Sequence, residues 1–409
     1  MNHPKSITQW TDTITTHFPH LSRPQAAVLA LWSLGMVLAR SCALTAVSTG
    51  LAAWLGRKEN TVRQQLREFC YEAEAKRGQQ RQALVVEACF VPLLGWVLSR
   101  WQSLHLALAL DATSLGQRFV VLTVSVLYRG CAIPVAWAIL PATEKHAWRG
   151  EWLRLLRLLR PAIPRPMNVI VLADRGLYAR WLFRRIVRLG WHPLLRINAG
   201  GKFCPDGQNR FQPLASFVPQ PDTRYSRTGT AFATRVCRLR CTLLACWEEG
   251  QAEPWLLLTD LPPEASDAAW YALRAWIEQG FKVIKRAGWQ WHKTRMTDPA
   301  RAARMWLAVA VATLWLLSVG GEADQTIPES TLPDDAVLPT RQRSRRATRL
   351  RLVSLFRRGW ILILVALLTH APLPLGDFVP EPWPVSPPQH QIVQDLSLII
   401  SGDHHYATL

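Results

Sequence analysis

Apolar residues in the first hundred positions follow the spacing of α-helices. Residues 25–39 and 43–55 are apolar with few breaks, and a further helix from 61 to about 71 is expected after the turn at Gly56. Glycine often follows the last residue of a helix because it adopts the left-handed backbone conformation without strain. The pattern therefore predicts a helical N-terminal domain over residues 1–95, with a possible DNA-binding role.

From about residue 103 the apolar runs become shorter and are bounded by turn residues, which is typical of strands. The expected strands are 105–110, 119–128, 132–140, 168–173 and 192–197, and the expected helices among them are 151–159 and 178–189. Leading strands joined by tight turns form a meander, whereas strands linked through helices pair in parallel by right-handed crossovers. We therefore predict an α/β fold, a ribonuclease-H-like mixed sheet flanked by helices.

Glycine, proline and serine interrupt residues 200–263, where strand-like runs occur at 231–239, 242–247 and 255–259. This pattern predicts a β-rich insertion, followed by helices over 266–286 and 299–319. The domain division is then 1–95 (helical), 103–199 (first part of the core), 200–263 (insertion), 264–321 (second part of the core) and 322–409 (linker and basic C-terminal region).

Two apolar stretches, 305–319 and 360–368, raise the question of whether the chain has a membrane-spanning helix. Both are shorter than the roughly 20 residues that a membrane-spanning helix needs. We interpret them as buried helices of a large core. The start of the chain does not resemble a signal peptide, and a reducing cytoplasm is the expected compartment.

The charge of the chain narrows the class of partner. Lysine and arginine number 48 against 29 acidic residues, which gives a formal net charge of +19. Such an excess suits a polyanion, because cations that neutralise phosphates release condensed counterions. An anionic membrane surface would also attract it. The cysteines at 237, 241 and 246 lack the spacing of a zinc site, and those at 42, 70, 89 and 131 are expected to be small buried residues.

Three clusters of basic residues are candidates for contact with a polyanion. The segment 56–59 and the helix after it, which carries Arg63, Gln64, Gln65 and Arg67, resemble a helix-turn-helix, although an ordinary solvated helix pair has the same pattern. Basic and aromatic residues also mix between 289 and 295, which suits backbone contact and stacking. The residues of this second cluster are Trp289, Trp291, His292, Lys293 and Arg295. The third cluster comprises Arg341, Arg343, Arg345, Arg346, Arg349, Arg351 and Arg357, and it could equally be a solvated face.

Three acidic residues are candidates for catalysis. Asp111 and Asp174 each follow an apolar strand, and ligands of open α/β sheets collect at the carboxyl ends of strands. Glu278 lies on the helix expected at 266–286, which could turn it toward both aspartates. Converging carboxylates repel one another unless hard cations lie between them. Two magnesium ions there could activate an attacking oxygen and stabilise the leaving oxygen during displacement at phosphorus.

The residues around Glu278 add a phosphate-binding pattern. Tyr271, Arg274, Glu278 and Lys285 are separated by three, four and seven residues, so they cluster on one side of a helix. An arginine and a lysine beside a metal-binding acid suit a phosphodiester substrate. The alternative is a solvent-exposed arginine–glutamate pair, which stabilises a helix by only about 0.2–0.5 kcal/mol.

These motifs together resemble the IS-four family of DDE transposases. The Tyr271, Arg274, Glu278 and Lys285 pattern looks like the family's Tyr-Arg-Glu-Lys signature, and the tripeptides that begin at Asp111 and Asp174 look like its two aspartate motifs. The resemblance covers about residues 106–317, and the space before Glu278 accommodates the β-rich insertion of that family.

The resemblance implies a residue-by-residue assignment. Asp111, Asp174 and Glu278 would be the catalytic and metal-binding acids for two Mg²⁺ ions, with Mn²⁺ able to substitute. Contacts to the DNA phosphates would come from four residues, Tyr271, Arg274, Lys285 and Arg175. Some members form hairpinned ends and support a flipped base with an aromatic residue of the insertion. The candidates here are Trp247, Trp255 and Phe232, which could equally be core residues.

The resemblance also implies a function and partners. The chain would cleave the inverted-repeat ends of an insertion sequence and join the 3′ hydroxyls to target DNA. We expect double-stranded DNA and a second copy of the chain as partners, no membrane, and a place at the nucleoid of a bacterial cytoplasm. Two alternatives remain: a decayed or accessory DNA-binding protein or nuclease of the same fold, and a membrane-associated basic protein without enzymatic activity.

Overall fold

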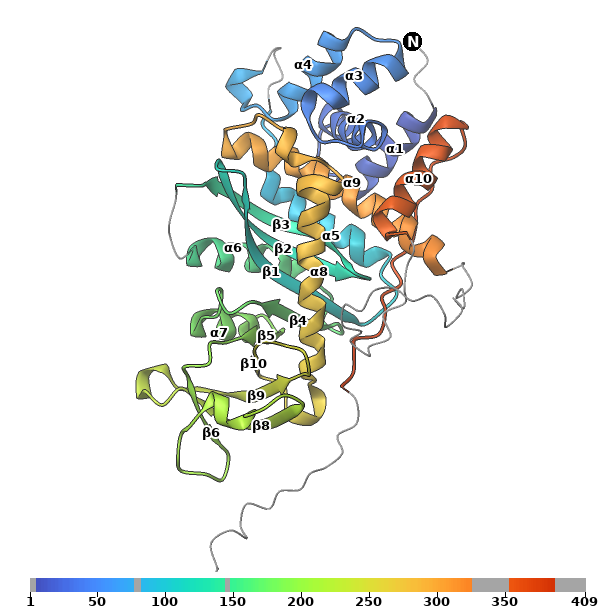
Figure 1. Cartoon of the computed structure of the whole chain (residues 1–409). Helices are drawn as coiled ribbons and strands as arrows, with labels where there is room; N and C mark the ends of the chain where they lie inside the picture. Colours follow the sequence, from blue (N-terminus) through green and yellow to red (C-terminus); the bar gives the residue numbers. More distant parts are fainter. Residues whose placement is uncertain (1–4, 77–81, 144–147, 326–352, 387–409) are drawn as a thin grey trace, which may run out of the picture.

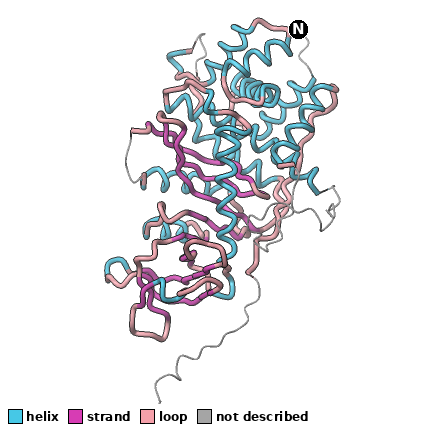
Figure 2. The backbone as a smooth tube through the Cα atoms, in the orientation of Figure 1, coloured by secondary structure: helices cyan, strands magenta, loops and turns pink. Residues whose placement is uncertain are grey.

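The computed structural model describes residues 5–76, 82–143, 148–325 and 353–386. Its centre is a ten-stranded sheet with the strand order β3-β2-β1-β4-β5-β10-β9-β8-β6-β7. Helices cover this mixed sheet on both faces, with the N-terminal helices grouped at one end and strands β6 to β9 at the other (Figures 1 and 2). The predicted α/β class with a mixed, helix-flanked sheet is confirmed.

The first five strands have the connectivity that the sequence predicts. β1 (His105–Leu115), β2 (Phe119–Tyr128) and β3 (Cys131–Pro141) form an antiparallel meander. β4 (Asn168–Ala173) and β5 (His192–Arg196) then add in parallel to β1 through the helices α6 (Arg149–Leu159) and α7 (Arg180–Arg188). This order of three antiparallel and two parallel strands is the ribonuclease-H-like arrangement.

β1 differs from its prediction in length. The strand was expected to end at residue 110, but it continues through Asp111 to Leu115. Its polar second half, from Asp111 to Ser114, pairs with the apolar strand β2 from Thr123 back to Val120. Pairing with a buried neighbour thus extends the strand beyond the apolar pattern that the sequence shows.

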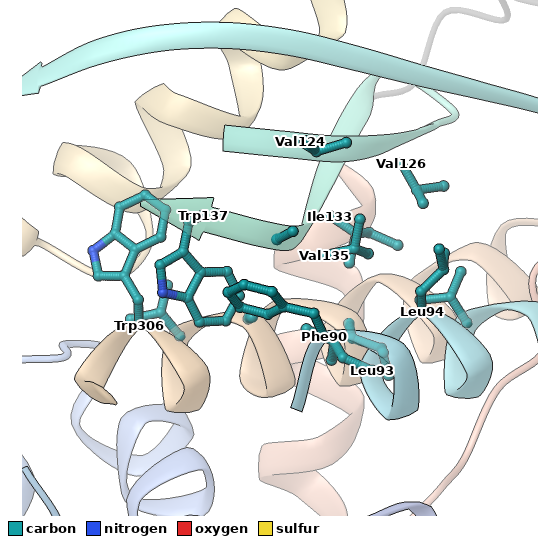
Figure 3. Close-up of a cluster of buried hydrophobic side chains, with 14 of the residues drawn as sticks. Phe90, Leu93, Leu94, Val124, Val126, Ile133, Val135, Trp137 and Trp306 are labelled. Carbon is teal, nitrogen blue, oxygen red and sulfur yellow. The ribbon is translucent and has the colours of Figure 1, made fainter. Parts of the chain in front are cut away.

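One face of the sheet packs on α5 (Phe90–Ser99), α6 and α9 (Pro299–Gln325). Figure 3 shows this core: Phe90, Leu93 and Leu94 of α5 meet strands β2 and β3. Trp137 of β3 lies between Phe90 and Trp306, with ring centroids 4.8 and 6.2 Å away, and its indole N–H donates to the Ala303 carbonyl. Burial of such aromatic rings holds α9 firmly against the sheet.

The opposite face of the sheet is covered by the helical segment that contains α8 (Ala275–Lys282). Small side chains such as Ala107, Ala109 and Ala132 let the helix approach closely. A Cβ placed on Gly280 would lie 2.8 Å from the Ala132 Cβ, closer than ordinary contact allows. The identity of residue 280 therefore sets how near α8 lies to β3.

The insertion strands prolong the central sheet. β10 (Trp255–Thr259) pairs antiparallel with β5, and β9 (Leu239–Trp247), β8 (Thr223–Ala231), β6 (Lys202–Pro205) and β7 (Gln212–Pro213) follow. The strand predicted at 231–239 is wrong. The chain turns at Phe232, whose φ is 68°, and the real strand β8 precedes it. Because β8 is mostly polar and partly exposed, its sequence lacks the apolar run of a buried strand.

The two long apolar stretches differ in burial. α9 has the length and composition of a membrane-spanning helix. The pair α2 (Arg23–Ala39) and α3 (Leu44–Leu55), which is bent by 93°, has them too if the two helices are counted as one broken span. In α9, 94% of the apolar window is buried inside the protein, as expected for a core helix. α10 (Leu355–Leu368) is buried only in part, contrary to prediction. One of its faces packs on α9, while the side chains of Ile361, Leu362, Val365 and Leu368 are exposed.

The N-terminal helices form the end of the molecule above the sheet in Figure 1. They are α1 (Lys5–His17), α2, α3 and α4 (Glu59–Phe69), and α4 begins two residues earlier than predicted. Arg304 of α9 is buried beneath them and donates to the carbonyls of Cys70 and Leu84 and to the Glu72 carboxylate. A buried arginine bonded in this way ties the helical end to the core.

Candidate active site

The alternation of side chains along β1 and β4 places both aspartates on the α8 face of the sheet. Ala107 and Ala109 of β1, and Ile170 and Leu172 of β4, line the core beneath α8. Asp111 and Asp174 continue these two rows, because alternate residues of a strand point to the same face. In the parallel register Leu110 pairs with Ala173, so the two aspartates are the next residues on neighbouring strands.

The helical segment above them is irregular. It begins at the N-cap Asp267 with a 3-10 helix, Ala268–Arg274, continues as α8, and ends in a π-helical turn, Val283–Ala287. The single α-helix predicted at 266–286 therefore changes its winding twice. Leu273, Ile277 and Phe281 pack on the sheet at intervals of four residues, and this places Arg274 and Glu278 at the edge of the packed surface.

The Arg274 guanidinium lies among all three acids. It is 3.0 Å from an Asp111 oxygen, 3.8 Å from an Asp174 oxygen and 2.5 Å from a Glu278 oxygen. The Arg274 side chain is only 12% exposed, against 18% for Asp111, 38% for Asp174 and 55% for Glu278. The three acids thus converge on one position, and a single positive charge lies there.

The other residues of the predicted signature border the same site. The Tyr271 hydroxyl donates to Asp174 over 3.3 Å, and the Lys285 ammonium donates to the Thr113 hydroxyl over 2.6 Å. Thr113 lies two residues after Asp111 and so on the same face of β1. The structure therefore brings Tyr271, Arg274, Glu278 and Lys285 to the two aspartates.

Arg175 also lies at the site, next to Asp174, but its side chain is paired. Its guanidinium is 2.7 Å from a carboxylate oxygen of Glu253, which also lies 3.5 Å from Arg196. Glu253 lies in the turn between β9 and β10 of the insertion. To contact a phosphate, Arg175 would have to leave Glu253 or bind both groups at once.

Of the three aromatic candidates in the insertion, Trp255 lies nearest to the signature. Its ring packs edge-on against Tyr271, with centroids 5.3 Å apart. The Trp247 indole donates to Gln251 in the hairpin turn, and Phe232 packs on Tyr178 at 5.6 Å. The structure thus connects only Trp255, among these three, to a signature residue.

Burial and neighbouring charges shift the pKa values of Asp111, Tyr271 and Lys285, and they also shift that of Arg274. Burial raises the pKa of Asp111, and the adjacent Arg274 opposes that rise. The pKa of Tyr271 is raised by burial and then by the negative charge of Asp174. Burial lowers the pKa of Lys285, although Asp111 acts in the other direction. Desolvation therefore determines the direction of the shift for Asp111, Tyr271 and Lys285, whereas for Arg274 burial is outweighed by the surrounding acids, which raise its pKa.

The chemistry of the donor set suits a hard cation. Three carboxylates that converge on one cationic group offer the oxygen ligands that magnesium and manganese prefer. Within the described ranges, however, no three His, Cys, Asp or Glu side chains are grouped tightly enough to hold a metal ion. Arg274 lies among the carboxylates, so metal binding would require its guanidinium to move and the acids to draw together.

Sequence reasoning missed Thr113 and Glu253 as partners of site residues. Thr113 had a signal, since a residue two positions after Asp111 on a strand must share its face. Glu253 had none, because only the folding of the insertion brings it to Arg175. Of the predicted C-terminal basic cluster, only Arg357 lies within the described residues, where it is exposed.

Comparisons with known proteins agree with the predicted resemblance to DDE transposases in part. Residues 141–315 match the family model described as the transposase DDE domain, a region that contains Asp174 and Glu278 but starts after Asp111. The match supports a DDE-type transposase and does not separate the IS-four family from other members. A search of the curated proteins found no match.

Among solved structures, one similar chain is that of a piggyBac transposase synaptic complex with hairpin DNA, solved by cryo-EM. The identity is 10%, the TM-score is 0.37, and the alignment covers 76% of this chain and 73% of the other. A similarity this low does not bear on the function of the chain.

Proposed function

We propose that this protein is a cut-and-paste DNA transposase that cleaves the ends of an insertion sequence and joins the 3′ hydroxyls to target DNA. The observation that carries the proposal is the convergence of Asp111, Asp174 and Glu278 on one guanidinium at a sheet edge. The match of residues 141–315 to the transposase DDE domain supports the same reaction class. Double-stranded DNA is the proposed substrate, and a second copy of the chain is the proposed partner on paired ends.

Asp111, Asp174 and Glu278 would hold two divalent cations, Mg²⁺ or Mn²⁺. When bound, such ions activate an attacking oxygen and stabilise the leaving oxygen at phosphorus. The protein's own residues act on the rest of the substrate. Once Arg274 moves from the acids, its planar guanidinium can grip a phosphate with two hydrogen bonds. Lys285, held by Thr113, places a second positive charge beside β1.

Tyr271 and Trp255 would form the side of the site that faces the insertion. Tyr271 holds Asp174 through its hydroxyl group and packs on Trp255 through its ring. A tyrosine hydroxyl is protonated at neutral pH, and burial raises the pKa of Tyr271 further, so the hydroxyl remains a donor to Asp174 or to a phosphate oxygen. Arg175 would add a further phosphate contact when its ion pair with Glu253 opens.

An excision assay in cells tests the proposal. A marker flanked by the DNA that borders this gene is supplied with the wild type, with Glu278→Gln, or with the control Glu264→Gln, which changes an exposed glutamate outside the site. We expect excision with the wild type and the control and none with Glu278→Gln. If none of the three excises the marker while the purified wild type binds the borders, the protein is a decayed or accessory DNA-binding protein.

A further inference from the structure

Two of the basic clusters noted in the sequence face each other across one groove. The groove has a volume of about 370 Å³ and runs between α4 and the segment that leads into α9. Arg63 and Arg67 of α4 line one side, while Lys293, Arg295 and Arg301 line the other. We call this feature the basic groove. It joins residues more than two hundred positions apart, so the sequence could not place them together.

The five cations of the basic groove are exposed and not neutralised by acids. The side chains of Arg63, Arg67, Lys293, Arg295 and Arg301 are all open to solvent. Across the described part of the chain, no ion pair joins any of them to a carboxylate. The one acid in the lining is Asp298, whose side chain caps the backbone N–H of Arg301 at the start of α9.

Packing fixes the positions of both sides of the basic groove. Val62, Leu66 and Phe69 bury the opposite face of α4, so its arginines must point outward. On the other side, the Arg118 guanidinium donates to the carbonyls of Thr294 and Met296 over 2.8 and 2.6 Å. Five cations on fixed elements give this surface a positive potential, which attracts an anionic ligand.

The aromatic content of the basic groove also suits a nucleic acid. The Tyr71 ring lies beneath two of the arginines, 4.5 Å from the Arg301 guanidinium carbon and 5.7 Å from that of Arg67. Such stacking holds the guanidinium planes in place and leaves their N–H groups free to face phosphate oxygens.

The basic groove is connected to the proposed active site. His292, the residue before Lys293, bonds through its ring to the Lys285 carbonyl over 2.7 Å. Arg118 lies in the turn that joins β1, the strand of Asp111, to β2. These contacts join one side of the basic groove to the helical segment and the strand that carry the proposed active site.

We propose that the basic groove binds the phosphodiester backbone of duplex DNA beside the reacting phosphate, independently of sequence. This inference rests on the proposed function, because it takes DNA as the substrate. The groove would hold the duplex by several phosphate contacts, and α4 would then act as a clamp on the DNA backbone. The number of phosphates that it neutralises sets how strongly binding depends on salt.

The test compares two triple variants of the full chain. One removes three groove cations, through Arg67→Gln, Lys293→Gln and Arg295→Gln. The control removes three exposed arginines that do not line the groove, through Arg157→Gln, Arg165→Gln and Arg188→Gln. Binding to a fluorescein-labelled duplex of random sequence is measured by anisotropy at several salt concentrations without divalent metal. Thermal melting checks that both variants are folded.

We expect the groove variant to bind at least about tenfold more weakly near physiological salt, with a salt slope lower by about 2–3, since each phosphate contact contributes about 0.9. The control variant should keep both values close to wild type. Equal losses in the two variants, or no loss in either, would overturn the groove assignment while leaving a transposase possible. Failure of the wild type to bind DNA at all would instead refute the proposed function.

A second arm separates DNA from an anionic membrane surface. The same proteins are sedimented with phosphatidylserine vesicles in the same buffers. Loss of vesicle binding in the groove variant, with DNA binding unchanged, would overturn the proposal in favour of a membrane ligand. Loss of DNA binding in the groove variant, but not in the control variant, supports the proposal.

Discussion

The Arg274 guanidinium lies 3.0 Å from the Asp111 carboxylate, and the same Nη2 atom lies 3.8 Å from Asp174. Asp111 comes from β1 and Arg274 from the end of the 3-10 helix that precedes α8, so this pair joins the sheet to the helix above it. One arginine thereby relieves part of the repulsion among three acids. The contact explains how the acids can lie together before any metal binds.

Replacing Arg274 should therefore destabilise the metal-free protein. Arg274→Gln leaves partly buried carboxylates facing one another, and we expect a loss of about 1–3 kcal/mol in unfolding free energy, discounted because Asp174 and Glu278 are partly exposed. Arg274→Lys keeps the charge and should lose less. Chemical denaturation measures both, and millimolar magnesium should restore more stability to Arg274→Gln than to the wild type. Identical losses in the two variants without a magnesium response would contradict this role.

Thr113 should act as a positioning residue for Lys285. Thr113→Val removes the hydroxyl that accepts from the ammonium, so we expect cleavage of the bordering DNA to slow about 2- to 10-fold, the effect of a hydrogen bond of about 0.5–1.5 kcal/mol. Thr113→Ser retains the acceptor and should stay close to wild type. Single-turnover cleavage rates at saturating DNA provide the measurement. A serine variant as slow as the valine variant would mean that packing of the methyl group, not the hydrogen bond, matters.

Enlarging Gly280 should push α8 away from β3. A valine there would collide with Ala132, and overpacking of this kind costs about 1–3 kcal/mol. Because Glu278 is carried by the same helix, cleavage should fall together with thermal stability. Adding Ala132→Gly opens space and should recover part of both. Full stability of Gly280→Val alone would show that the helix can shift without cost.

His17 should make the protein less stable in mildly acidic solution. Burial, with a smaller effect from Arg100, lowers the pKa of His17 from 6.5 to about 4, and its ring stacks on Trp96 at 4.2 Å. The folded state therefore favours the neutral ring. Its contribution is present above pH 6.5 and is lost as the pH falls toward 4. Allowing for its partial exposure, we expect a loss of about 1–2 kcal/mol across this range.

The measurement is the unfolding free energy of the wild type and of His17→Gln between pH 7 and 4. The variant should show a flatter profile, since its side chain does not titrate. Parallel profiles would mean that other groups cause the acid sensitivity.

The sequence by itself determined the order of elements in the core and singled out the three acids that the structure brings together. Apolar runs that end near Asp111 and Asp174, and the spacing from Tyr271 to Lys285, are local patterns, so they can be read without knowing the fold. The alternation of side chains on β1 and β4 even fixes which face both aspartates share.

Only the tertiary structure decided what these residues touch. The placement of Arg274 among the acids, the pairing of Arg175 with Glu253 and the meeting of α4 with residues 293–301 all depend on contacts between distant segments. The polar strand β8 and the polar end of β1 likewise form because neighbouring strands supply their hydrogen bonds. The local sequence determines which secondary structure a segment favours, whereas tertiary packing determines which residues it contacts. In this protein those contacts determine which charged side chains lie together at the site and in the basic groove.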